Sequence, residues 1–77
     1  MASVRAWLVI TVAAGSSKVT KTGVALTAAS LVLATLHQDV PGVWVRSAVP
    51  DSAGSSFTVH LNKAAPASTK IAWFVVN

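Results

Sequence analysis

The sequence predicts an all-β fold, a six-stranded antiparallel β-sandwich that forms a single domain over residues 1–77. Glycines and prolines interrupt the chain about every 8–12 residues, a spacing typical of short strands joined by turns. The segments between them are rich in valine, threonine, isoleucine and tryptophan, the residue types that favour strands. Several of these segments alternate apolar and polar side chains, which is the period of a strand with one buried face.

Six segments fit strands when the chain is followed from its beginning. We expect strands over residues 4–12, 18–24, 31–38, 43–49, 56–62 and 70–76. Turn signals separate them: small residues at 13–17, polar residues at 27–30, and loops that contain a proline at 50–55 and 63–69. Residues 39–42 read Asp-Val-Pro-Gly, a turn in which proline fixes φ and glycine is free to adopt a positive φ.

The third segment has an alternative interpretation, a helix over residues 24–37. Leu26, Ala29, Leu33 and Leu36 recur at helical spacing, and alanine and leucine are good helix formers. Local pattern alone leaves this choice open.

The fourth and fifth segments predict a hairpin with one apolar and one polar face. Residues 56–62 carry Phe57, Val59 and Leu61 on one face, alternating with polar residues on the other. Because a slip of one residue turns every side chain to the opposite face, the apolar faces should set the register. The expected pairs are Val49 with Phe57, Ser47 with Val59, Val45 with Leu61, Arg46 with His60, and Trp44 with Asn62.

The first, third and sixth segments are apolar on both faces, so both faces must be shielded from water by other parts of the protein or by a partner. Apolar residues make up 53% of the chain and charged residues 10%, against about 25% charged in typical domains. The sandwich core covers one face of each strand, and we expect other copies of the chain to cover the second face, in an oligomer. The expected interface residues are Trp7, Leu8, Leu33, Trp44, Ile71, Trp73, Phe74 and Val76.

The same composition weighs against other classes. Residues 6–14 form the longest uncharged apolar stretch before a breaker, shorter than the about 20 residues of a membrane-spanning helix. Residues 1–14 also resemble a miniature signal peptide, although a first strand is the preferred interpretation. The chain has no cysteine, and its net charge of +4 comes from cations scattered along the sequence, so we expect no disulfide and no specific nucleic-acid partner.

Catalytic and metal-binding patterns are absent from the sequence. His37 and Asp39 stand two residues apart in a turn, Asp51 lies beside a proline, and the chain has no glutamate and no glycine-rich phosphate loop. We therefore expect a protein that is not an enzyme and that uses no cofactor or metal. One set of residues has the composition of a sugar- or peptide-binding patch, although a subunit interface is the preferred interpretation of Trp44. The set consists of Trp44, Arg46, His60 and Asn62.

The stretch from residue 26 to residue 77 resembles a known group of modules. The sequences LTAASLVLATL, GVWVRSAVPD and SSFTVHLNKAAPASTKIAWFVVN are similar to the C-terminal modules of phage tail-fibre and bacterial surface proteins, whose plan resembles the H-type lectin domain. The resemblance implies a strand over residues 31–38, a trimer of six-stranded sandwiches, a secreted, cell-surface or virion setting and, in some relatives, carbohydrate binding. It supplies no site residues. Residues 4–12 are more apolar than the resemblance implies, which suggests a further hypothesis, assembly into a larger or engineered particle.

Overall fold

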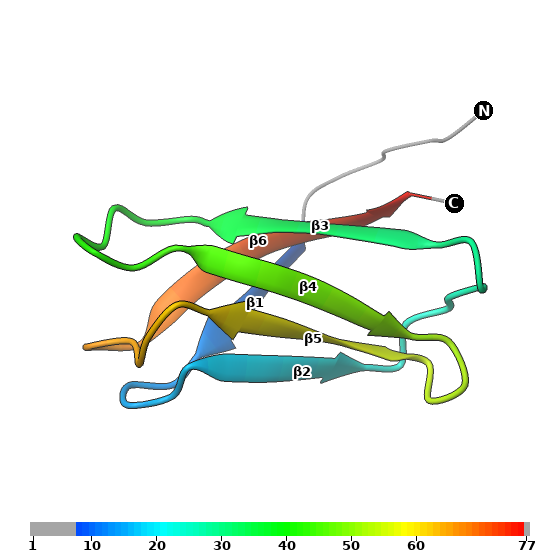
Figure 1. Ribbon diagram of the computed structural model, residues 1–77, viewed down its shortest axis with the longest axis horizontal. Coiled ribbons are helices and arrows are strands. Elements are labelled where there is room, and N and C mark those ends of the chain that lie inside the picture. Colours follow the sequence, from blue (N-terminus) through cyan, green and yellow to red (C-terminus); the bar gives the residue numbers. More distant parts are fainter. Residues whose placement is uncertain (1–7, 77) are drawn as a thin grey trace.

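Two three-stranded antiparallel sheets make up the fold (Figure 1). The computed structural model describes residues 8–76, and no helix occurs among them. The first sheet, sheet A, has the strand order β1-β6-β3, and the second, sheet B, has the order β2-β5-β4. The strands are β1 (Leu8–Val12), β2 (Lys18–Thr22), β3 (Leu31–Leu36), β4 (Val45–Asp51), β5 (Ser56–Leu61) and β6 (Thr69–Val76). This confirms the predicted all-β, six-stranded antiparallel fold.

The third segment is a strand, so the helical alternative for residues 24–37 is wrong. β3 pairs with β6 from Leu31↔Val76 to Leu36↔Ile71. A tight turn precedes it, in which the Ser30 N–H donates to the Thr27 carbonyl over 3.0 Å and the Thr27 N–H donates to Ser30 Oγ over 2.8 Å. Pairing with the long strand β6 therefore overrides the helical propensity of the leucines and alanines. The first predicted strand is described only from Leu8, because residues 4–7 lie outside the described part of the chain.

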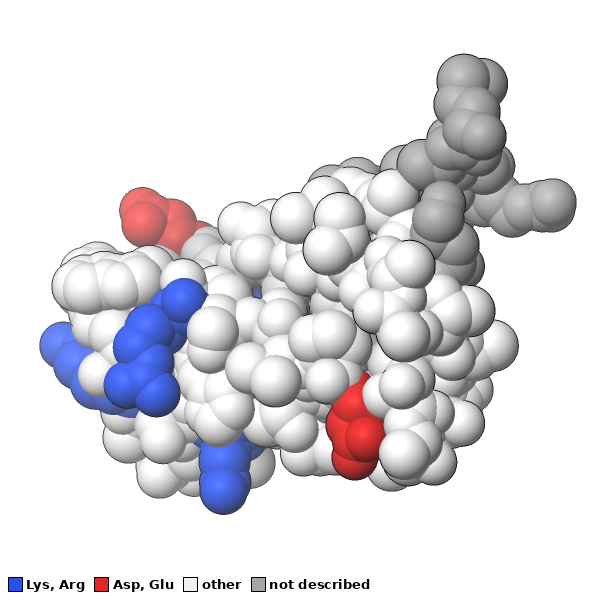
Figure 2. All heavy atoms as spheres, turned by 45° about the vertical axis from the view of Figure 1, so that its right-hand side comes forward, with Lys and Arg blue, Asp and Glu red and all other residues white. Residues whose placement is uncertain are grey.

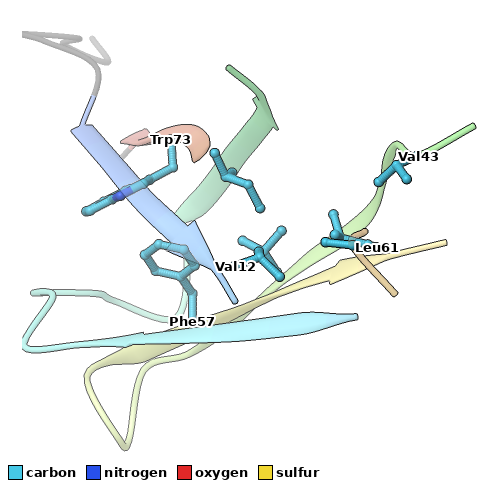
Figure 3. Close-up of a cluster of buried hydrophobic side chains, with 8 residues drawn as sticks. Val12, Val43, Phe57, Leu61 and Trp73 are labelled. Atoms are coloured by element: carbon cyan, nitrogen blue, oxygen red, sulfur yellow. The ribbon is translucent and has the colours of Figure 1, made fainter. Parts of the chain in front are cut away.

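The core lies between the two sheets (Figure 3). Its buried apolar residues are Val12, Val43, Phe57, Val59, Leu61, Ala65, Ile71 and Trp73. Phe57 of sheet B and Trp73 of sheet A pack against each other in this core, with ring centroids 4.7 Å apart and ring planes inclined by 55°. Ile71 is 0% exposed and Trp73 is 5% exposed. The structure therefore places both residues in the core of the chain itself, which corrects the prediction that they lie at a subunit interface. Both side chains take the inward positions of β6 and hold the chain's own sheets together.

The hairpin of β4 and β5 has a different register from the predicted one. Val45 pairs with Leu61 as expected, but Arg46 is an extra residue at a β-bulge, and Ser47 stands opposite His60. Beyond the bulge every pair is shifted by one residue, so Val49 faces Thr58 instead of Phe57. The bulge brings Ala48 against the core and leaves Val49 exposed. Simple alternation could not predict this, because a bulge changes the period locally.

Loops gather at two opposite ends of the sandwich. One end holds the loops at residues 13–17, 37–44 and 62–68 (left in Figure 1), and we call it the basic end for the cations described below. Backbone hydrogen bonds join two of these loops: the Gly15 N–H donates to the Ala65 carbonyl over 2.8 Å, and the Ala65 N–H to the Ser16 carbonyl over 2.9 Å. The opposite end holds the loops at residues 23–30 and 52–55.

Candidate interaction surfaces

The outer face of sheet A is apolar. β6 runs through its centre, and the pairs Val9↔Ala72, Leu33↔Phe74 and Leu31↔Val76 place side chains of neighbouring strands next to each other. Because successive side chains of a strand alternate between faces, these residues point away from the core. We call this surface the apolar face, and it consists of Val9, Leu31, Leu33, Ala72, Phe74 and Val76.

Solvent reaches much of the apolar face, although it carries no charge. Leu31 is 63% exposed and Leu33 is 49% exposed, while Phe74 and Val76 are half-buried. Among the described residues, the polar side chains of this face lie on the part nearer the basic end, where Thr35 pairs with Ala72 and Lys70 pairs with Thr11. A contiguous apolar patch without a charged residue is characteristic of surfaces that contact a partner.

The expected interface residues divide among several places. Leu33, Phe74 and Val76 lie on the apolar face, and Leu8 is exposed at the start of the edge strand β1. Trp44 lies in the loop just before β4, and Trp7 falls outside the described residues. The expected interface set did not include Val9, Leu31 or Ala72, although they share the period-two alternation of Phe74 and its partners.

The outer face of sheet B is polar. One row across it joins Lys18, His60 and Ser47, and the next joins Thr20, Thr58 and Val49. The hydroxyl oxygens of Thr20 and Thr58 lie 3.0 Å apart and form a hydrogen bond between strands. Such a surface is satisfied by water, so sheet B needs no partner to cover it.

An exposed tryptophan lies where this polar face meets the basic end. Trp44 is 58% exposed, and it follows the buried Val43 and precedes the core-facing Val45, so its ring points away from the core. Asn62 holds its backbone: Asn62 Oδ1 accepts the Trp44 N–H over 2.8 Å, and Asn62 Nδ2 donates to the Gly42 carbonyl over 2.9 Å. The Asn62 N–H also donates to the Trp44 carbonyl over 3.2 Å. Asn62 thus positions the tryptophan and has its amide already engaged.

The expected patch residues meet here, together with one lysine that the sequence did not indicate. Trp44 lies beside Asn62 as predicted, whereas Arg46 sits at the bulge next to Ser47 instead of directly opposite His60. Lys18 pairs with His60 from the other side of β5. Only the sheet pairing reveals this neighbour, because Lys18 and His60 are far apart in the sequence. We call the group Lys18, Trp44, Arg46 and His60 the Trp44 patch.

Two further features are absent from the described residues. Within residues 8–76, no three histidine or carboxylate side chains lie close enough together to hold a metal ion. The same residues include no helix long and apolar enough to cross a membrane. His37 and Asp39 are both exposed in the loop between β3 and β4. Comparisons with protein-family models, with curated proteins and with solved structures found no match.

Proposed function

We propose that this protein is a structural self-association module, whose copies join through the apolar face. The observation that supports this proposal is the chemistry of that face: six neighbouring side chains on three strands, all apolar, on the outside of the molecule. The proposal includes no catalytic role. The resemblance of residues 26–77 to trimeric modules supports three copies as the assembly.

The apolar gain from association is similar in size to its cost. Complete burial of a large apolar side chain contributes about 1.5–3 kcal/mol, and a half-exposed side chain has about half of this left to gain. Five large side chains on each copy then contribute about 10 kcal/mol to a contact between two copies, against an association cost of about 4–15 kcal/mol. Because the two terms are of similar size, one buried charge on this face should be enough to separate the copies.

The experiment is sedimentation equilibrium at low micromolar concentration. We expect a mass of three times the 7.9 kDa chain for the unaltered protein and the chain mass for Leu33→Asp. Val49→Asp is the matched control, since Val49 is 51% exposed and Leu33 is 49% exposed, but Val49 lies on sheet B. It should leave the assembly intact.

Two outcomes would overturn the proposal: a folded monomer of the unaltered chain, or equal dissociation by both aspartate variants. Should Leu33→Asp fail to fold, as circular dichroism would show, Leu33→Thr replaces it. Threonine keeps the strand propensity of the position and removes much of its apolar surface.

A second candidate function is carbohydrate binding at the Trp44 patch. The observation that favours it is the exposed indole of Trp44, on a loop whose backbone Asn62 holds through hydrogen bonds to Trp44 and Gly42. An exposed aromatic ring beside cationic and polar side chains suits the stacking of a sugar ring. Binding to a glycan array that is abolished by Trp44→Ala, with the assembly intact, would support it. Loss of the assembly in that variant would instead assign Trp44 to a subunit interface.

A further inference from the structure

The tertiary structure gathers cations that are scattered along the sequence. Of the six lysines and arginines, Arg5 lies outside the described residues and Lys21 lies toward the other end of β2. The remaining four stand within two residues of a strand boundary at the basic end. They are Lys18 at the start of β2, Arg46 near the start of β4, Lys63 just after β5, and Lys70 near the start of β6. Figure 2 shows the lysine and arginine atoms concentrated toward one end of the molecule.

Little negative charge balances this end. Asp39 is its one acidic residue, and Asp51 lies at the opposite end, where its carboxylate accepts the Gly54 N–H over 3.2 Å. Among residues 8–76, Lys18 and Arg46 have no carboxylate partner, and both are exposed. Their charges are therefore available to an anionic ligand on the outer face of sheet B.

We propose that the Trp44 patch binds an acidic carbohydrate, a proposal that rests on the second candidate function. One sugar ring stacks on the Trp44 indole, and its carboxylate lies between Lys18 and Arg46. These two cations flank the row at His60, because Lys18 pairs with His60 on one side and the bulge at Arg46 lies on the other. Hydrogen bonds from cationic groups to a carboxylate are shorter and stronger than neutral ones, so the acid group sets the specificity.

Nucleic acid fits this surface less well. Single-stranded nucleic acids bind on platforms of several aromatic rings that stack successive bases. Among the described residues, Trp44 is the one largely exposed aromatic side chain, since Phe57 and Trp73 are buried and Phe74 is half-buried on the other sheet. One ring with two flanking cations suits one acidic sugar unit.

The patch and the apolar face lie on opposite sides of the sandwich, so association leaves every patch accessible. An assembly then presents several identical sites to one polymer, and such multivalency raises apparent affinity about 10²–10⁴-fold when the geometry permits simultaneous binding. Leu33→Asp should consequently weaken binding to a long acidic polysaccharide and leave binding to a short oligosaccharide unchanged.

The test uses isothermal titration calorimetry with two tetrasaccharides that differ only in the group at C6 of each sugar, tetragalacturonate and its neutral galactose counterpart. We expect binding of the acidic form, a loss of about tenfold in Lys18→Gln or Arg46→Gln, and no measurable binding in Trp44→Ala. Lys21→Gln is the matched control, because it removes the same charge from the same strand outside the patch. It should change the affinity by less than about twofold.

Three other results would each overturn a different part of the proposal. Equal binding of both tetrasaccharides would remove the acidic specificity and leave the second candidate function standing. Binding of a single-stranded DNA oligonucleotide but of neither saccharide would overturn both. An equal loss in Lys18→Gln and Lys21→Gln would show general attraction of anions and would overturn the site. Sedimentation equilibrium of the same variants measures their self-association independently of saccharide binding.

Discussion

The two outer faces of the sandwich differ in chemistry although the same rule of alternation builds both. On sheet B, the central strand β5 alternates buried apolar residues such as Phe57 and Val59 with Thr58 and His60. On sheet A, the central strand β6 alternates buried residues with Ala72, Phe74 and Val76. Each sheet contributes one face to the shared core. The chemistry of its other face then indicates whether that face contacts water or a partner.

The largest expected effect comes from the core, which both sheets share. Phe57→Ala removes a fully buried ring that packs on Trp73, and it should lower the free energy of unfolding by about 3–5 kcal/mol. Urea denaturation at fixed protein concentration measures the change. The adjacent Thr58→Ala, on the polar outer face, should change it by less than about 1 kcal/mol. Similar losses in the two variants would contradict the assignment of faces.

The next largest effect is expected when the outer face of sheet A is made polar like that of sheet B. Threonine at both Leu31 and Leu33 keeps β3 a strand and makes the apolar face resemble the threonine rows of sheet B. We expect a folded monomer by sedimentation equilibrium and circular dichroism, because most of the apolar gain from association is removed. A persistent trimer would show that the copies join through another surface.

Asn62→Ala tests the support of the Trp44 patch. The variant removes the two side-chain hydrogen bonds to the backbone of Gly42 and Trp44, and it should cost about 1–3 kcal/mol of stability. It should also weaken saccharide binding, since the loop that carries the indole is no longer held in place. Thermal melts measure the first effect and calorimetry the second. Unchanged binding would mean that the position of Trp44 does not depend on Asn62.

The smallest effect is expected for a substitution among the solvent-exposed threonines of sheet B. Thr20→Val removes an exposed hydrogen bond to Thr58 but retains a β-branched side chain with high strand propensity. The free energy of unfolding should stay within about 0.5 kcal/mol of the unaltered value in urea denaturation. A loss above about 2 kcal/mol would show that this face contributes more than a solvated surface.

Local pattern was sufficient for most of the fold. Five of the six strands begin within two residues of their predicted starts, because turn residues and alternation are properties of short segments. The helical alternative could not be excluded at that level, because leucine and alanine favour a helix and only the pairing of β3 with β6 makes this segment a strand. The bulge at Arg46 was equally inaccessible, because no turn residue marks it.

The candidate surfaces depended more on pairing between distant segments. The sequence by itself determined that three strands are apolar on both faces and that charged residues are rare. Only the tertiary structure decided that these three strands form one sheet, that Ile71 and Trp73 face inward, and that Lys18 joins His60. The physical reason is that side-chain alternation is encoded locally. Which strand lies beside which, and which of two apolar faces meets the core, depends on contacts between residues far apart in the chain.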